Sequence, residues 1–294
     1  MDVSVEIFPP KSANQAQSLT TELDAMAAFR PLFVSVTCGA GGTTQERTHA
    51  LVAELHRAGR MEVAAHLTCV RRRQIEVDAE ALDYLALGVQ HIVALRGDPP
   101  EGSTSRDIPA DGYAYAADLV AGLARLGPFD ISVAAYPEPH PESTSAEADL
   151  DNLKRKVDAG ASRAITQFCF DTDTVFRFID RARAAGIGVP IHIGVLPILD
   201  FDRAVAFAST CGASVPDALK ARFAAAGSEP ASRRAVALDV AREQCAALDR
   251  GGVDGVHFYT LNRAAMSLEI CRSLGWTVPC QARAAEGRPH LSDR

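Results

Sequence analysis

Residues Ile92 to Pro100 read IVALRGDPP. The first four residues are apolar, as in a strand that is buried on both faces. Arg96, Gly97 and Asp98 follow, and two prolines then end the pattern. In parallel α/β folds, polar residues at the carboxyl end of a buried strand commonly build the binding site. A strand end closed by a surface ion pair would read the same way, so this stretch alone leaves both interpretations open.

The same arrangement recurs along the chain and predicts a barrel. Eight apolar runs are expected to be strands: residues 3–8, 33–37, 63–69, 91–96, 131–136, 164–170, 191–196 and 253–261. Helical periodicity follows them in residues 13–29, 44–58, 74–87, 112–126, 145–159, 172–185, 202–211 and 264–274. Strands that alternate with helices indicate a parallel sheet. Eight such units favour an α/β fold of the (β/α)8 TIM-barrel type over an open doubly wound sheet.

The segment between the seventh and eighth expected strands is longer than one βα unit needs. Residues 216–250 are rich in Ala, Arg and Glu, and residues 227–230 (GSEP) interrupt them. We expect two extra helices there, outside the barrel or over its mouth. Residues 1–280 are expected to form a single barrel domain. Residues 281–294 are polar and without periodicity, which predicts a disordered tail.

Composition and charge narrow the classes of function. The 294-residue chain is 47% hydrophobic and carries a net charge of −7, without a basic cluster suited to nucleic acid. No apolar run approaches the about 20 residues that cross a bilayer. The first expected strand begins at Val3, so we expect no signal peptide. The seven cysteines include no CxxC pair, as in a reduced protein. We predict a cytoplasmic protein that binds neither nucleic acid nor membrane.

Polar residues stand at nearly every expected strand end. Glu6 lies in the first apolar run, VEIFPP, and His66 lies in the third, before LTC. Others at or near strand ends are Thr37, Arg96, Gly97, Asp98, Tyr136, His140, Gln167 and Arg263. One buried polar residue is commonly a satisfied core group, but each costs ~1–3 kcal/mol if it is left unpaired. Their number therefore predicts a functional pocket.

The helix after the fifth strand carries a polar stripe. Asp149, Asn152 and Lys156 follow the spacing i, i+3, i+7, about a quarter turn from the apolar stripe of the helix. A solvated face is the simplest interpretation. Beside a barrel mouth, however, such a stripe could hold the hydroxyls and phosphates of a long cofactor.

Several familiar motifs are absent. Residues 39–44 (GAGGTT) lack the last glycine of the GxGxxG fingerprint, and no P-loop, HExxH or GxSxG is present. The histidines do not fall at metal-binding spacings, so we expect no metal.

These segments together resemble the methylenetetrahydrofolate reductase family, in its bacterial, single-domain type. The matching segments are VEIFPPKS, FVSVTCGAGGTTQERTH, HLTC, HIVALRGDPP, FDISVAAYPEPHPES, ADLDNLKRKVDAGASRAITQFCFD, GVLPI and FYTLNRAAMS. The resemblance implies a flavoprotein that binds FAD and uses NADH or NADPH to reduce 5,10-methylenetetrahydrofolate to 5-methyltetrahydrofolate. Folate and nicotinamide are both flat and can stack in turn on the same flavin face, which favours a ping-pong cycle. The resemblance favours NADH by analogy, and it allows a homo-oligomer.

The resemblance also implies roles for individual residues. Glu6 falls at the general acid that opens the folate ring to an iminium cation, and Asp98 falls at a carboxylate beside flavin and folate. Positions that contact substrate would be Glu6, Asp98, Gln167, Arg203, Phe207 and Arg263. Positions that contact FAD would be Thr37, His66, Arg96, Gly97, Asp98, Tyr136, His140, Asp149, Asn152, Arg155 and Lys156.

Two positions depart from the family pattern. Cys38 stands where many relatives carry an aromatic residue, and Arg203 stands where some carry glutamine. These departures affect substrate contacts rather than the reaction.

Elementary chemistry supports the role of Glu6. Hydride transfer to a methylene carbon needs an electrophile, so an acid must first open the ring. A carboxylic acid can do this near neutral pH only if burial raises its pKa, and Glu6 lies in an apolar run.

Three other interpretations stay open. A related barrel could pass hydride directly from NADH to the folate without flavin, although the polar stripe from Asp149 to Lys156 favours FAD. A lyase or methyltransferase acting on the same folate would need a zinc or Schiff-base signature, which we do not find. A folate-binding protein without activity would give no reason for an acid at Glu6.

Overall fold

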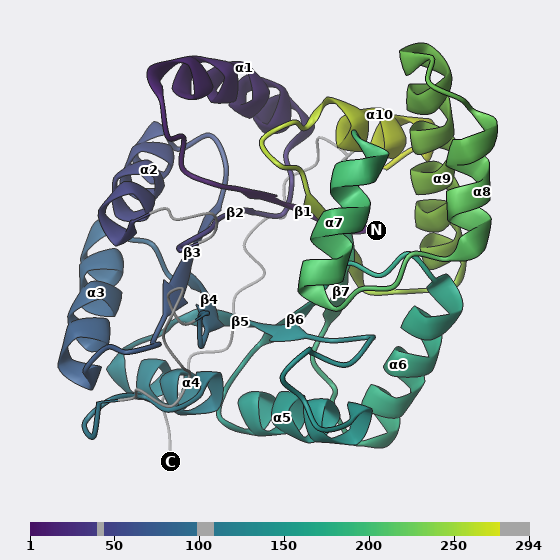
Figure 1. Ribbon diagram of the computed structural model, residues 1–294. Helices are drawn as coiled ribbons and strands as arrows, with labels where there is room; N and C mark the ends of the chain where they lie inside the picture. Colours follow the sequence, from purple (N-terminus) through teal and green to yellow (C-terminus); the bar gives the residue numbers. More distant parts are fainter. Residues whose placement is uncertain (40–43, 99–108, 277–294) are drawn as a thin grey trace.

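The computed structural model describes residues 1–39, 44–98 and 109–276. Eight parallel strands close into a barrel in sequence order, surrounded by helices (Figure 1). The strands are β1 (Asp2–Ile7), β2 (Val34–Val36), β3 (Val63–Thr68), β4 (His91–Leu95), β5 (Asp130–Ala135), β6 (Arg163–Thr166), β7 (Ile191–Val195) and β8 (Gly255–Tyr259). β8 closes the barrel against β1, with Tyr259 opposite Glu6. The predicted TIM barrel is confirmed.

Ten helices are assigned in the described residues. They are α1 (Ala13–Phe29), α2 (Gln45–Ala58), α3 (Gln74–Leu87), α4 (Ala116–Leu126), α5 (Ala146–Asp158), α6 (Thr172–Ala184), α7 (Phe201–Cys211), α8 (Asp217–Ala225), α9 (Pro230–Arg250) and α10 (Ala265–Ser273). None of them is long and apolar enough to cross a membrane.

Local sequence explains where several helices begin. Ser12, Ser145, Asp171 and Asp200 accept hydrogen bonds from backbone N–H groups in the first turns of α1, α5, α6 and α7. α4 begins at Ala116 rather than at the predicted residue 112, because a turn and an isolated bridge occupy the residues before it.

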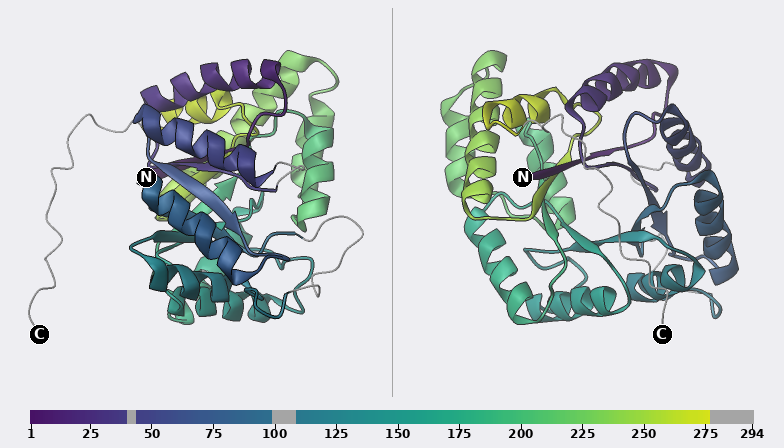
Figure 2. Two further views of the ribbon diagram at one scale, coloured as in Figure 1. Left: turned by 90° about the vertical axis from the view of Figure 1, so that its left-hand side faces the viewer. Right: turned by 180° about the vertical axis from the view of Figure 1, so that it is seen from behind.

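The two extra helices between β7 and β8 are present. Glu229 caps α9 and Pro230 occupies its first turn, so the chain turns between α8 and α9 where the sequence predicts a break. α9 packs against α6, α8 and α10. The pair therefore lies outside the barrel and not over its mouth, as Figures 1 and 2 show. The predicted disordered tail, residues 281–294, lies outside the described residues.

The barrel interior holds both apolar and polar side chains. A separate cluster of buried apolar side chains consists of Ala64, Val93 and Ile165, on β3, β4 and β6, and Phe33, the residue before β2. Ser4, His192 and His257 are buried on β1, β7 and β8 and are joined by hydrogen bonds. A polar seam thus runs inside the wall that also carries Glu6.

Candidate active site

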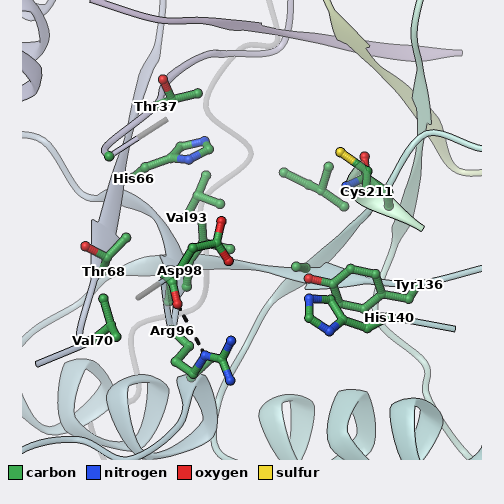
Figure 3. A pocket seen from close by; sticks show the side chains of 18 of the residues that line it. Thr37, His66, Thr68, Val70, Val93, Arg96, Asp98, Tyr136, His140 and Cys211 are labelled. Atoms are coloured by element: carbon green, nitrogen blue, oxygen red, sulfur yellow. Dashed lines mark hydrogen bonds between the residues drawn. The ribbon is translucent and has the colours of Figure 1, made fainter. Parts of the chain in front are cut away.

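A pocket of about 630 Å³ opens at the carboxyl ends of the strands. Thirteen of the sixteen predicted site residues line it: Glu6, Thr37, His66, Arg96, Gly97, Asp98, Tyr136, His140, Asp149, Asn152, Lys156, Gln167 and Phe207. Figure 3 shows Thr37 and His66 on one side of the pocket and Tyr136 and His140 on the other, with Asp98 between them in this view. The strand ends therefore meet in one cavity, as the repeated pattern predicts.

Three predicted residues do not line the pocket. Arg155 is exposed on α5 and donates a hydrogen bond to Asn152 Oδ1 at 2.7 Å. Arg203 has a side chain that is 89% exposed and pairs with Asp200 at 3.5 Å. Arg263 is exposed in the loop after β8. Their proposed contacts with FAD or substrate stay predictions. Each of these side chains would have to reach the ligand from outside the residues that line the pocket.

Glu6 lies between two buried histidines. Its Oε2 atom is 3.5 Å from His66 Nε2 and 3.9 Å from His257 Nε2. Burial raises the pKa of Glu6, and His66 opposes this shift. Burial also lowers the pKa of His66 to about 4, although the Glu6 charge opposes it. The arrangement favours a protonated carboxyl beside a neutral imidazole.

The turn after β4 needs glycine at position 97. Gly97 has φ +86°, and a Cβ atom there would lie 3.0 Å from both Thr68 Cβ and Val70 Cγ1. The Arg96 Nε–H group donates to Gly97 O at 3.2 Å, the dashed line in Figure 3. The backbone therefore turns tightly enough to bring Asp98 to the pocket wall.

Arg96 and Asp98, the two charged residues of this turn, do not share one ion pair. Arg96 pairs with Glu142, from the loop after β5, at 2.7 Å. Asp98 takes no part in that ion pair and lies exposed on the pocket wall. The strand end is therefore not a simple Arg–Asp cap.

The polar stripe on α5 is not a solvated face. Asp149 and Lys156 are only 9% and 8% exposed. The Asp149 carboxylate accepts a hydrogen bond from His140 N at 2.7 Å, and Lys156 Nζ donates to Ala134 O. Burial lowers the pKa of Lys156 to about 8, although Asp149 opposes this shift. The stripe places a buried amine and a buried carboxylate at the pocket wall.

An aromatic surface forms another part of the wall. Phe207 on α7 is 40% exposed, and its ring stacks on Phe168 with centroids 5.4 Å apart. The Phe168 ring also meets the edge of Tyr259 at 5.9 Å. Gln167 lines the same pocket and accepts a hydrogen bond from Phe168 N at 3.0 Å. A flat ring system could pack on this surface, with the amide group near it.

Nearly the whole chain matches one protein family. Residues 1–275 match the model of the family described as methylenetetrahydrofolate reductase. The chain belongs to the methylenetetrahydrofolate reductase family.

Bacterial relatives of this methylenetetrahydrofolate reductase family member are similar along nearly their whole length. The chain is 45% identical to the 5,10-methylenetetrahydrofolate reductases of Salmonella typhimurium and Escherichia coli over 275 residues, which are 94% of this chain and 91% of each relative. It is 32% identical to methylenetetrahydrofolate reductase (NADH) 1 of Arabidopsis thaliana, covering 92% of this chain and 48% of that protein.

A solved structure shares the fold. A Clostridium thermocellum protein that binds two copies of 5-methyl-5,6,7,8-tetrahydrofolic acid superposes with a TM-score of 0.62 and 12% identity, over 94% of this chain and 96% of that one.

Some pocket residues of this methylenetetrahydrofolate reductase family member were not predicted. His257, Cys211 and Glu142 line the pocket beside the predicted set. Position 257 lies two residues before Tyr259 on β8, so alternation along the strand is the signal that could have found it. Among the described residues, no three His, Cys, Asp or Glu side chains gather as a metal site would require.

Proposed function

We propose that this chain reduces 5,10-methylenetetrahydrofolate to 5-methyltetrahydrofolate, with hydride from NADH or NADPH carried through FAD in a ping-pong cycle. The observation that carries the proposal is the Glu6 carboxyl, which is 21% exposed and has its pKa raised by burial, at the wall of a pocket that also contains an aromatic surface. The 45% identity to bacterial proteins named for this reaction supports the same substrate.

The pocket wall fits a large polar cofactor. Thr37 Oγ1 and His66 Nε2 are buried and have no hydrogen-bond partner among the described residues, although buried polar atoms are normally satisfied. Asp149, Asn152 and Lys156 present charged and amide groups from α5. We propose that these five residues hold FAD, with the α5 groups suited to its hydroxyls and phosphates. When bound, FAD supplies a two-electron carrier that accepts hydride from NAD(P)H and delivers it to the folate.

Glu6 is proposed to act as the general acid. Its carboxyl keeps a proton to higher pH than an exposed glutamate does, because burial disfavours the charged form. Transfer of that proton to the ring nitrogen breaks the bond between this nitrogen and the methylene carbon. The carbon then becomes an iminium electrophile that hydride can attack.

Asp98 and the aromatic wall are proposed to favour the same step. The iminium cation would form near the Asp98 carboxylate, and a negative charge lowers the free energy of a developing cation. Gln167 can donate and accept hydrogen bonds at the pterin edge while Phe207 packs on its face. Correct placement reduces the entropy lost at the transition state.

An absorption spectrum tests this function. The purified protein, supplied with FAD and freed of excess, is expected to show flavin bands that bleach anaerobically with NADH or NADPH and return when methylenetetrahydrofolate is added. A comparison of the two nucleotides gives the preferred donor. A colourless protein that oxidises NADH with methylenetetrahydrofolate would contradict the role of FAD and favour direct hydride transfer. A flavin that is bleached but not restored by the folate would contradict the proposed substrate.

A further inference from the structure

A chain of hydrogen-bonding side chains runs inside the barrel below Glu6. The Ser4 hydroxyl is 2.8 Å from His257 Nδ1 and 3.3 Å from His192 Nδ1. All three side chains are at most 1% exposed. They come from β1, β8 and β7, which are neighbours in the closed sheet. The seam therefore joins three strands by a continuous polar path.

One end of this path reaches Glu6. His257 contacts Ser4 through Nδ1, and its other nitrogen, Nε2, is 3.9 Å from Glu6 Oε2. This gap is longer than a hydrogen bond, so a bridging water or about 1 Å of motion must close it. His257 is thus placed between the acid and the seam.

The other end approaches the amino-terminal rim of the barrel. His192 is the second residue of β7 and lies opposite Gly255, the first residue of β8. A Cβ atom at Gly255 would lie 2.9 Å from His192 Nε2, so the absence of a side chain leaves room for this ring. His192 Nε2 therefore lies against the first residue of β8, at the end of the barrel opposite the pocket.

Both histidines are held in the neutral state. Burial lowers the pKa of His192 and of His257 to about 3. A neutral imidazole has one donor nitrogen and one acceptor nitrogen, and a serine hydroxyl can donate and accept at once. Each member of the seam can accordingly take a proton on one side and release one on the other.

Each turnover of the proposed reaction removes one proton from Glu6, and this proton must be replaced. Each turnover adds one hydride to the methylene carbon and one proton to the nitrogen that leaves it. Glu6 supplies that proton and becomes a carboxylate, while a bound folate would cover its pocket side. The remaining approach is from inside the barrel, where the seam lies.

We propose that His192, Ser4 and His257 form a proton relay that supplies Glu6 from the amino-terminal end of the barrel while folate occupies the pocket. This inference rests on the proposed function. His257 Nε2–H passes its proton to Glu6, the Ser4 hydroxyl passes its proton to His257 Nδ1, and His192 Nδ1–H passes its proton to Ser4 Oγ. His192 Nε2 takes one proton from a water molecule at the rim, which must enter the barrel because the His192 ring is only 1% exposed. One proton enters, one reaches Glu6, and each relay member ends neutral.

Ser4→Ala breaks the relay at its middle, and Ser132→Ala is the matched control. Ser132 is also fully buried inside the barrel, and its hydroxyl is likewise 2.8 Å from a histidine nitrogen, His91 Nε2. Its partners are His91 and Arg163, and no hydrogen bond joins it to Ser4 or Glu6. Ser4→Ala removes the hydrogen bonds to His257 and His192, and Ser132→Ala removes the hydrogen bond to His91, but only Ser4→Ala interrupts the path to Glu6.

The kinetic test mixes reduced enzyme with methylenetetrahydrofolate at a pH one unit above the pKa of Glu6. The titratable groups that face Glu6 in the described residues are His66, His257 and Tyr259; burial holds the histidines neutral and raises the pKa of Tyr259 well above 10. In the wild type and in Ser132→Ala, the relay protonates Glu6 after folate binds, and a single phase is expected.

In Ser4→Ala, only enzyme already protonated at mixing can react quickly. That fraction is about one tenth, so a roughly ten-fold loss of fast-phase amplitude is expected, with Ser4→Thr restoring it. A single full-amplitude phase in Ser4→Ala would overturn the relay. Loss of amplitude in Ser132→Ala as well would also overturn it, since any buried Ser–His contact would then have the same effect.

Histidine ¹⁵N spectra test the relay without folate. The relay predicts that the His257 proton moves from Nε2 to Nδ1 when Glu6 gains a proton, and that Glu6→Gln abolishes this pH-dependent change. A His257 tautomer that does not respond to Glu6 would overturn the relay, even if Ser4→Ala fails to fold. If wild-type enzyme does not reduce methylenetetrahydrofolate, the proposed function fails, and the spectra still decide the relay.

Discussion

The Glu6 carboxyl lies 3.5 Å from the His66 imidazole, and burial favours the neutral form of both groups. An acid and a base at this distance would form an ion pair in water, because glutamate is normally ionised where histidine is protonated. Here the pKa of Glu6 is raised and that of His66 falls to about 4. The barrel thus favours the protonated form of a carboxyl at the wall of the pocket.

The pH dependence of folate reduction follows from this shift. A general acid is active when protonated, so the folate half-reaction is expected to lose rate as pH rises through the pKa of Glu6, which lies above 4.5. The fall approaches about ten-fold per pH unit beyond it. His66, with a pKa of about 4, stays neutral over this range. Stopped-flow rates across pH check this, and a folate rate that rises with pH would contradict it.

Asp98→Asn is expected to slow the folate half-reaction by a smaller factor than loss of the acid. Asp98 is exposed at the pocket wall, so water screens its charge and weakens its effect on a nearby cation. We expect about a ten-fold loss, which is about 1.4 kcal/mol in the barrier. The measurement is the rate of flavin re-oxidation by methylenetetrahydrofolate. An unchanged rate would reduce Asp98 to a structural residue of the strand end.

Lys156→Met is expected to weaken FAD binding by about 10- to 150-fold, the range for losing a hydrogen bond of about 1.5–3 kcal/mol to a charged group. The pKa of Lys156 is lowered to about 8, so its charge is present below that pH and is lost above it. Wild-type affinity should therefore decrease as pH rises through 8, while affinity of the variant should not. Isothermal titration of the flavin-free protein measures both.

Lys154→Met is the matched control for this prediction. Lys154 lies on the same helix, pairs with Asp158 and does not line the pocket. Its replacement should leave FAD affinity unchanged. Equal effects of the two substitutions would indicate damage to α5 rather than loss of a cofactor contact.

The sequence predicts the site well where one strand end decides the position. Thr37, Arg96 and Tyr136 follow buried strands directly, and in a closed parallel barrel all such positions meet at one end. The spacing of Asp149 and Lys156 likewise places them together on one face of α5.

Sequence reasoning is weaker where a side chain's direction or a distant partner decides the outcome. Arg203 lies on the first turn of α7 but pairs with Asp200 outside the pocket. The Arg96–Glu142 ion pair depends on a loop 46 residues away, and Ser4 meets His257 across 253 residues. No local period encodes the Arg96–Glu142 and Ser4–His257 contacts, because they depend on which strands become neighbours when the barrel closes.

Anaerobic stopped-flow of the Glu6→Gln protein tests the central claim most directly. The amide keeps the shape of the side chain but cannot donate an acidic proton. NADH or NADPH is expected to bleach the flavin at nearly the wild-type rate, while methylenetetrahydrofolate restores the oxidised bands about 10²- to 10⁴-fold more slowly. Restoration at the wild-type rate would contradict the assignment of Glu6 as the acid that opens the folate ring.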